Sequence, residues 1–356
     1  MSWFEKLSNK IFCGCSPCQV EEEQIGTMDT ELLEENKKGA MSSNEKVDDH
    51  RVSLFVKDMG GSFDFDLNRP EADKTITSSS VMNKILKNAS EEVKRIYKKY
   101  GQYKYSIYDW YNLGLDKDDL VEEQDFSSYC GEVRKGTQVR EGKGVSLGSQ
   151  GDLYEGFFKH GRQYGKGRMI FHNNTLYQGD FKNGIAHGFG IFIDCESGGM
   201  RKAEFKQGKI HGEGIEKWAD GTTFKGFYRK GKKSGFGVFR WADGSSYEGD
   251  LQKDELNGLG TLKMPDGRKY EGHFENSNMH GEGTFYWPDG KRYVGSYRNG
   301  QKHGRGKMMF PDGQEYYGEW VDGDVTGDTF ITDENGKKTK QYVEKGEVIK
   351  NLTNLF

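Results

Sequence analysis

The stretch that decides the fold is YEGHFENSNMHGEGTFYWPDG, residues 270–290, and two residues later a second copy follows as YVGSYRNGQKHGRGKMMFPDG, residues 293–313. Both copies place an aromatic residue, a glycine and another aromatic residue at alternate positions, and both end in Pro-Asp-Gly. Alternation with period two is typical of a β-strand that turns one face toward a core. Each copy therefore predicts two short strands joined and followed by turns.

Copies of this unit recur along the C-terminal two-thirds of the chain. They begin at Tyr129, Tyr154, Tyr177, Arg201, Phe224, Tyr247, Tyr270, Tyr293 and Tyr316. The first steps are 25, 23 and 24 residues, and five consecutive steps of 23 residues follow. A fixed period of this length indicates a repeat architecture in which each unit packs against its neighbours. We expect a mainly β fold: one elongated, single-layer antiparallel sheet of tandem hairpins over residues 129–335, with an aromatic face and a charged face.

Glycines explain how such a sheet could pack. Asp-Gly pairs such as Asp289-Gly290 supply residues that tolerate the positive φ of tight turns. Glycines at the third, twelfth and fourteenth places of a unit would weaken ordinary strands, but they leave room for an aromatic ring from a neighbouring hairpin. The positions expected to build this packing are Tyr154, Gly156, Tyr177, Gly179, Tyr247, Gly249, Tyr270, Gly272, Gly281, Gly283, Tyr293, Gly295, Gly304 and Gly306.

The pattern Tyr-Glu-Gly, then His-Gly-x-Gly, then Asp-Gly resembles the MORN (membrane occupation and recognition nexus) repeat, most clearly at residues 270–290 and 293–313. The fourth unit departs from it, with Arg201 and Ala203 where Tyr and Gly are expected. The resemblance implies a half-pipe used in membrane-associated, cytoskeletal, ciliary and cell-division scaffolds. MORN arrays also occur fused to lipid kinases and lysine methyltransferases, but no remaining segment is long or apolar enough to be either catalytic domain.

Composition limits the partners. Residues 1–128 carry 17 Lys+Arg against 25 Asp+Glu, and residues 129–356 carry 35 against 31. Neither part is basic enough to suggest nucleic acid as a partner. The five cysteines form no disulfide framework, which favours a reducing, cytoplasmic compartment. We find no secretory signal and no apolar run of 18 residues.

Residues 1–20 predict a membrane anchor. An amphipathic helix would gather the apolar residues Trp3, Phe4, Leu7, Ile11 and Phe12 on one side. Three thiols follow, at Cys13, Cys15 and Cys18. Several acyl chains attach a protein durably where one does not, so we predict S-acylation of these cysteines. Unmodified cysteines in a disordered tail, or a metal site without an evident fourth ligand, remain alternatives.

The other regions outside the array predict a tether and caps. Residues 21–78 read as an acidic disordered tether, since residues 21–73 hold 15 acidic and six basic side chains. Within residues 79–128 we expect a helix over Ser80–Tyr100, stopped by Gly101, and then an aromatic segment that either caps the first sheet edge or docks a partner. Residues 336–356 are expected to form a C-terminal cap or tail.

Signs of chemistry are weak. The glycines of residues 161–167 superficially evoke a P-loop, but their spacing is wrong and no Ser or Thr follows Lys166. The unit places His187, His211, His280 and His303 equivalently. Adjacent ones would lie on the order of 10 Å apart, too far to share a zinc ion. We predict no enzyme, no cofactor and no metal.

Two binding functions remain. We favour a scaffold for protein partners, cytoskeletal or ciliary, with exposed aromatic residues forming the contact surface. Such a protein would be cytoplasmic and peripheral to a membrane, the cell cortex, or a cilium or flagellum. The alternatives are an anionic-lipid-binding module, with the basic patch Arg229, Lys230, Lys232 and Lys233, and an accessory subunit of an enzyme.

Overall fold

The computed structural model describes residues 79–104, 116–122 and 127–352, with residues 116–122 as backbone only. The predicted anchor of residues 1–20, with its cysteines, and the predicted tether of residues 21–78 lie outside the described residues. Within the described residues the prediction of fold class is confirmed. They form one open antiparallel sheet and two short helices.

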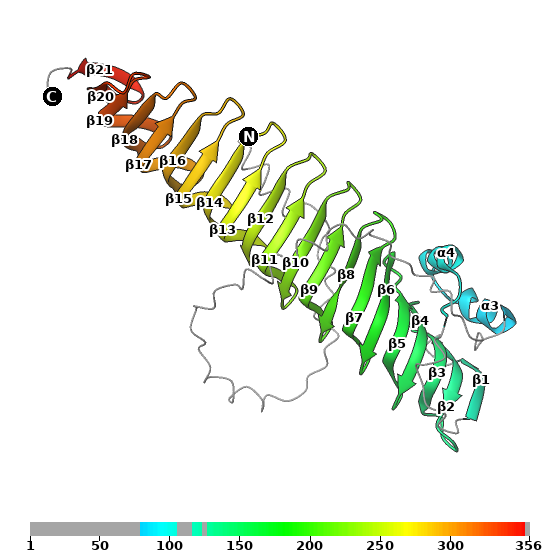
Figure 1. Ribbon diagram of the computed structural model, residues 1–356. Coiled ribbons are helices and arrows are strands. Elements are labelled where there is room, and N and C mark those ends of the chain that lie inside the picture. Colours follow the sequence, from blue (N-terminus) through cyan, green and yellow to red (C-terminus); the bar gives the residue numbers. More distant parts are fainter. Residues whose placement is uncertain (1–78, 105–115, 123–126, 353–356) are drawn as a thin grey trace, which may run out of the picture. The chain divides into compact units, whose positions relative to one another are not determined.

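The sheet is a meander of 21 strands in which each strand pairs with the next one along the chain (Figure 1). The strands are β1 (Asp116–Glu122), β2 (Ser128–Val133), β3 (Arg140–Leu147), β4 (Leu153–Lys159), β5 (Arg162–Ile170), β6 (Thr175–Lys182), β7 (Ile185–Asp194), β8 (Met200–Lys206), β9 (Lys209–Lys217), β10 (Thr223–Arg229), β11 (Lys232–Arg240), β12 (Ser246–Gln252), β13 (Glu255–Lys263), β14 (Lys269–Glu275), β15 (Asn278–Tyr286), β16 (Arg292–Arg298), β17 (Gln301–Met309), β18 (Glu315–Val321), β19 (Asp324–Thr332), β20 (Lys338–Glu344) and β21 (Glu347–Asn351).

Two kinds of turn alternate along the sheet. The two-residue turns have positive φ at both positions, as at Asn299 (49°) and Gly300 (81°), which is the type I′ geometry that suits a tight hairpin. In the Asp-Gly turns only the glycine has positive φ, as at Gly290 (87°). The aspartate instead acts as a local acceptor, since the Lys291 amide donates to Asp289 Oδ1 at 3.1 Å. The glycine of the Asp-Gly pair thus supplies the positive φ that the turn needs, and the aspartate supplies the side-chain acceptor.

A tyrosine ring lying across two glycines is the repeated packing element. A Cβ placed on Gly283 would lie 2.5 Å from Cε2 of Tyr270, and one on Gly272 would lie 2.6 Å from the Gly283 Cα. The Tyr270 hydroxyl donates to the His273 carbonyl at 2.9 Å. The ring thus covers glycines of its own unit, which corrects the expectation that it comes from a neighbouring hairpin.

The twelfth-place glycine has a different role. Gly281 has φ of +56°, and the nearest atoms to a Cβ placed on it all belong to His273, the first being its Cβ at 3.4 Å; no tyrosine, phenylalanine or tryptophan ring is among them. Opposite this glycine the register shifts between β14 and β15, from Gly272↔Gly283 to Phe274↔Met279. Gly281 therefore serves a bulge and a left-handed backbone conformation instead of making room for a ring.

Edge-to-face ring contacts join one unit to the next. Phe274 contacts Tyr270 of its own unit and Tyr247 of the preceding unit, with centroids 5.2 and 5.3 Å apart. Two runs of such contacts exist, and they are Tyr129–Phe158–Tyr154–Phe181–Tyr177–Phe205 and Tyr247–Phe274–Tyr270–Tyr297–Tyr293–Trp320. We call the surface that carries these rings the first face.

Helices cover part of the opposite, second face. Residues 79–100 form two helices, α3 (Ser79–Lys87) and α4 (Glu91–Tyr100), so the prediction of one continuous helix is wrong. Ser90 interrupts it because its Oγ accepts the Val93 amide at 3.3 Å and caps α4. Gly101 ends α4 as expected, with φ of 70°.

A buried ion pair joins the end of α4 to the sheet. Glu155 follows Tyr154 in β4 and so points to the second face. It pairs with Arg168 of β5 (Nε to Oε2, 3.1 Å), and it accepts the backbone amide of Tyr103 at 3.1 Å. Tyr103 is itself buried. The start of the predicted aromatic capping segment therefore packs on the sheet, whereas its residues 105–113 lie outside the described residues.

The tyrosine–glycine packing makes a stability prediction. Gly283→Ala forces a Cβ into the Tyr270 ring, so we expect it to lower the stability of the array by about 1–3 kcal/mol, as overpacking does. Thr284→Val, next in the same strand but on the second face, is the matched control and should change stability by less than about 0.5 kcal/mol. Thermal denaturation followed by circular dichroism measures both. Equal melting temperatures for the two variants would contradict the packing described above.

Candidate partner-binding surfaces

The repeat tyrosines are not available to a partner. Tyr154, Tyr247, Tyr270 and Tyr293 are among the largest fully buried side chains, each no more than 1% exposed. The neighbouring rings and the glycine backbone fill the first face around them. The expectation that the exposed aromatic residues of the repeat form the contact surface therefore fails for these positions.

At the fourth unit the first face carries charged side chains in place of the tyrosine ring. Arg201 occupies the tyrosine position, and Glu216 of β9 lies opposite it in the register. The Arg201 Nε lies 2.9 Å from the Glu216 Oε1, so an ion pair stands where other units place an aromatic ring opposite an apolar side chain, as at Tyr247↔Leu262 and Tyr270↔Phe285. The first run of ring contacts ends at Phe205, within this unit, and the second begins at Tyr247, two units further on.

A caged lysine completes this ionic group. The Lys233 Nζ lies 3.0 Å from Glu216 Oε2. Four aromatic rings surround the ammonium with centroids within 6 Å, those of Trp218 (5.2 Å), Phe224 (5.2 Å), Tyr228 (5.6 Å) and Phe239 (5.9 Å). Ring faces and one carboxylate together replace the water that a buried ammonium loses. Burial and the nearby Glu216 carboxylate hold the pKa of Tyr228 well above its usual range.

The predicted basic patch is therefore smaller than the sequence suggests. Arg229, Lys230 and Lys232 are exposed at the type I′ turn between β10 and β11, where Lys230 has φ of 53°. Lys233 is only 8% exposed, because alternation along β11 turns it to the first face and into the cage. Three of the four residues remain for contact with an anionic surface.

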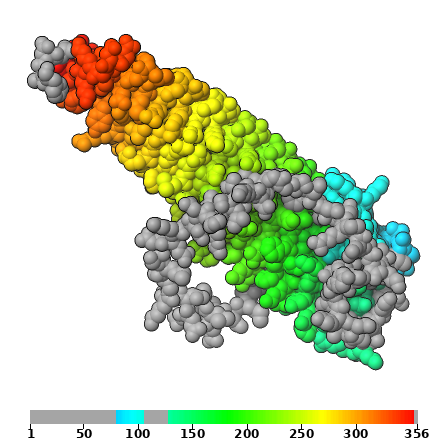
Figure 2. Space-filling view, viewed as in Figure 1, coloured from blue at the N-terminus to red at the C-terminus, as the bar shows by residue number. Residues whose placement is uncertain are grey.

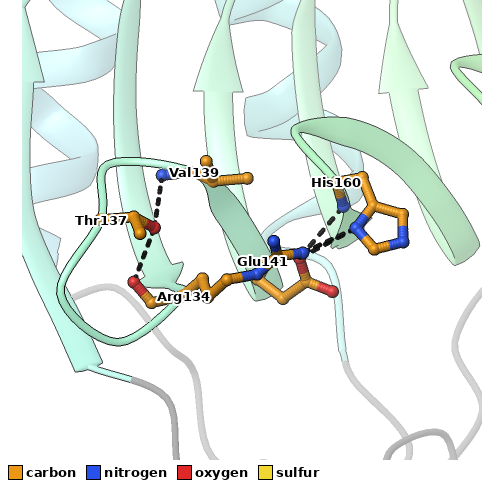
Figure 3. Close-up of polar contacts among 5 residues, drawn as sticks. All are labelled: Arg134, Thr137, Val139, Glu141 and His160. Atoms are coloured by element: carbon orange, nitrogen blue, oxygen red, sulfur yellow. Dashed lines mark hydrogen bonds and ion pairs between the residues drawn. The ribbon is translucent and has the colours of Figure 1, made fainter.

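A polar cluster links the loop of residues 134–139, between β2 and β3, to the two-residue turn between β4 and β5 (Figure 3). The buried Glu141 accepts the Arg134 Nη2 and the His160 backbone amide, both at 3.1 Å. Thr137 Oγ1 donates to the Arg134 carbonyl at 2.8 Å and accepts the Val139 amide at 3.2 Å. Because these polar groups bond to one another across neighbouring turns, the cluster braces the turns.

A second cation, half-buried, lies on the first face near the C-terminal end. The Lys302 Nζ lies 3.9 Å from the Trp320 ring centroid and 5.5 Å from that of Tyr293. Burial lowers the pKa of Lys302 to about 8, although the charge of Asp324 opposes this shift. The positions that precede it in the same place of the unit hold Leu256 and Met279, which are apolar and buried.

The second face presents the exposed apolar side chains. A cross-strand row on β16 to β20 follows the register Val294↔Lys307↔Tyr317↔Phe330↔Lys340. Its three apolar members, Val294, Tyr317 and Phe330, are 41%, 44% and 41% exposed. We call these three residues the C-terminal strip. Reading the repeat for its tyrosines and glycines misses it, but the strand alternation of the same units reveals it.

The glycine run of residues 161–167 and the repeat histidines lie in the hairpins of the sheet. Gly161 lies in the turn of the β4–β5 hairpin, and the rest of residues 161–167 lies in β5. His280 and His303 lie near acidic side chains, Glu275 at 3.3 Å and Asp322 at 3.7 Å. Among the described residues, no group of three or more His, Cys, Asp or Glu side chains is placed to hold a metal ion. Searched over those same residues, the helices include none long and apolar enough to cross a membrane.

Lys302 makes a pH-dependent prediction. The pKa of Lys302 is lower in the folded state than in the unfolded chain. Between about pH 8 and 10.5 the unfolded state therefore binds more protons than the folded state. The free energy of unfolding should consequently rise with pH through that window. Lys302→Met, which copies Met279, should raise the melting temperature at pH 7 and remove this rise. Melting curves at pH 7, 8 and 9 test this, with Lys345→Met at an exposed turn as the control. A lower melting temperature for Lys302→Met at pH 7 would show that the ring contacts outweigh the burial of the charge.

Comparison with known proteins supports the repeat assignment. The model of the MORN repeat family matches seven consecutive segments, and they are residues 154–176, 177–196, 202–223, 224–246, 247–267, 270–292 and 293–315. The divergent fourth unit is among them. No curated protein matches the chain.

Two solved structures illustrate what the fold is similar to. The TCP10 domain of Danio rerio CPAP is 12% identical over 59% of this chain and 99% of that chain, with a TM-score of 0.34. The TCP domain of Drosophila melanogaster SAS-4, in complex with a proline-rich motif of Ana2, is 11% identical over 55% and 97%, with a TM-score of 0.29. Scores of this size support neither a shared function nor shared partners.

The seven matched segments, the 23-residue period and the repeated tyrosine–glycine packing agree with one another. The chain carries seven MORN repeats, in tandem over residues 154–315.

Proposed function

We propose that this protein is a non-catalytic scaffold that organises protein partners near a membrane or a cytoskeletal or ciliary structure. The observation that carries the proposal is the C-terminal strip, Val294, Tyr317 and Phe330, on the second face of the sheet. Aromatic side chains held on a rigid sheet supply contact area with little loss of conformational entropy on binding. The first face is filled by its own rings, so the second face offers the protein its surface for partners.

The charges beside the strip suit a polar rim. Lys307 pairs with Glu315 at 2.6 Å, and Lys340 pairs with Asp328 at 2.7 Å. A central apolar contact surrounded by charged groups is the usual arrangement of a protein interface. In this proposal the scaffold has no catalytic activity of its own. If the protein were an accessory subunit of an enzyme, it would bind that enzyme through the C-terminal strip.

Substitution of the strip tests the scaffold. The double variant Tyr317→Ser/Phe330→Ser, in the full chain, should no longer label a subset of the neighbouring proteins in a proximity-labelling experiment. It should also bind each of these neighbours, once purified, about tenfold or more weakly, because aromatic anchors carry most of an interface's affinity. Glu248→Gln, on the same face but outside the strip, is the control. Unchanged neighbours and affinities for the double variant would refute a role for this surface.

Lipid binding is the second candidate, and the exposed turn residues Arg229, Lys230 and Lys232 favour it. Basic groups attract anionic headgroups through long-range charge, which added salt screens. Contact through the C-terminal strip should largely persist in salt, so salt dependence separates the two candidates.

For the N-terminus we propose attachment to the membrane through acylated Cys13, Cys15 and Cys18, beside the apolar residues Trp3, Phe4, Leu7, Ile11 and Phe12. Two or three acyl chains are needed for durable attachment. Replacing all three cysteines by Ser, or treating the protein with hydroxylamine, should move it from the membrane to the soluble fraction. Ser substitution of Cys130 and Cys195, the cysteines within the sheet region, is the control. Full membrane retention of the triple variant would place the anchor elsewhere and favour lipid binding by the array.

A further inference from the structure

The second face carries two neighbouring blocks of opposite charge. Strand alternation and the register identify the side chains that β8 to β11 turn to this face. On β8 and β9 the cations are Lys202, Lys206, Lys209 and Lys217, and on β10 and β11 they are Lys225, Arg229, Lys232 and Arg240. The carboxylates on this face of the same strands are Glu204 and Glu213. Eight cations against two carboxylates give a formal net charge of +6 with histidines neutral, and we call this surface the basic block.

The next four strands reverse the sign. The second face of β12 to β15 carries the carboxylates Glu248, Asp250, Glu255, Glu271, Glu275 and Glu282. Its cations are Lys263 and Lys269, and Lys269 pairs with Glu271 at 2.8 Å. Six carboxylates against two cations give a formal net charge of −4, and we call this surface the acidic block. The two blocks adjoin between β11 and β12 and belong to the green-to-yellow middle of the array (Figure 2).

An exposed apolar side chain lies in each block. Leu259 of the acidic block is 58% exposed, and Phe227 of the basic block is 38% exposed. Both lie beside the row of paired glycines that crosses these strands, since Phe227 follows Gly226 and Leu259 precedes Gly260. Their strands, β10 and β13, are each the second strand from the boundary between the blocks. The two apolar side chains are therefore placed almost symmetrically about that boundary.

A face with one basic and one acidic half complements a second copy of itself. A two-fold axis that runs parallel to the strands between β11 and β12 turns the array end for end. Each basic block then faces the acidic block of the other copy, and Phe227 of each copy faces Leu259 of the other. Packed sheets cross at about 30°, so the two arrays diverge away from the axis and contact each other near it.

The two blocks are large enough for a dimer contact. Eight strands at ~4.8 Å cover about 38 Å, and strands of seven to nine residues are about 23–30 Å long. Up to about 900–1,100 Å² of each face is thus available, and a stable interface uses about 800 Å² per partner. Charged groups lose water in such a contact, so complementary charge mainly sets the orientation of the two copies. We therefore expect a dissociation constant in the micromolar range.

We propose that two copies of this chain associate antiparallel through their second faces, with the basic block of each copy on the acidic block of the other. Such a dimer carries two C-terminal strips and joins two partners of the same kind. The strip begins at β16, beyond the acidic block, so this inference goes beyond the proposed scaffold and either can fail alone.

Sedimentation equilibrium of the full chain tests the association. The average mass should rise from that of a monomer toward that of a dimer between about 1 and 100 μM protein at ~50 mM salt. Raising the salt to ~500 mM should weaken the association about tenfold or more, because salt screens the attraction between the blocks. A monomer throughout this range at low salt, or a dimer whose dissociation constant does not change with salt, would overturn the proposal.

Charge reversal tests the antiparallel pairing. The first variant, with Glu at the exposed positions of Lys202, Lys206, Lys209 and Lys217, changes the basic block from +6 to −2. The second variant, with Lys at the exposed positions of Glu248, Glu275 and Glu282, changes the acidic block from −4 to +2. Each variant alone should stay monomeric up to about 100 μM, because like charges then face each other. An equal mixture should form a heterodimer, because opposite charges face each other again at both contacts.

The matched control carries the same number of reversed charges outside both blocks, with Glu in place of the exposed Lys337, Lys338, Lys345 and Lys350. It should dimerise like the unchanged chain. Circular dichroism confirms that each variant is folded. Dimerisation of either block variant alone at the original strength, or a mixture of the two folded variants that remains monomeric, would refute the antiparallel pairing.

Discussion

The whole array depends on one contact, a tyrosine ring lying flat across two glycines that face each other on neighbouring strands. At Tyr270 the ring covers Gly272 and Gly283, and its hydroxyl donates to the carbonyl of His273. The glycines are required because a Cβ would enter the ring, and the hydroxyl satisfies a carbonyl beside the bulge. Burial accordingly raises the pKa of the repeat tyrosines. A single-layer sheet has no second layer to cover its apolar side, and this contact supplies the missing cover from within most units.

The fourth unit shows what happens when the tyrosine is replaced. Arg201 and Glu216 form an ion pair where other units place an aromatic ring opposite an apolar side chain, and the Lys233 ammonium from the next unit pairs with the same Glu216. Burying charge is costly unless each charge is paired, and one carboxylate cannot fully balance two cations. The four rings around the Lys233 ammonium supply part of the remaining stabilisation. The change is therefore concerted across the two units, and the strands keep their register through it.

Much of the fold could be predicted from the sequence because copies of the repeat follow one another directly, at a nearly constant spacing. The period located the units, and the alternation located the strands. Of the predictions that were wrong, two depend on contacts between strands or units, and a third depends on a local helix cap. The ring comes from its own unit, since the bulge at Gly281 brings Gly283 opposite Gly272. Lys233 is buried because a neighbouring unit provides a cage. The helix breaks at Ser90, whose side chain caps α4. As for the site, the sequence alone could not show that the first face is closed to partners.

The residues on the two faces of the sheet are consequently under different packing constraints. Residues of the first face are constrained by the ring–glycine contact, so their pattern identifies the fold and says little about partners. Residues of the second face are not subject to that constraint, and there the units differ from one another. The C-terminal part presents Val294, Tyr317 and Phe330, whereas on β7 to β9 Lys202 lies between Ile191 and Ile215. Strand pairing places these unlike residues in continuous cross-strand rows, which a comparison of single units does not display. In a protein of this kind specificity is therefore expected in the rows across units, where one face of a common scaffold can differ at each strand without disturbing the packing on the other.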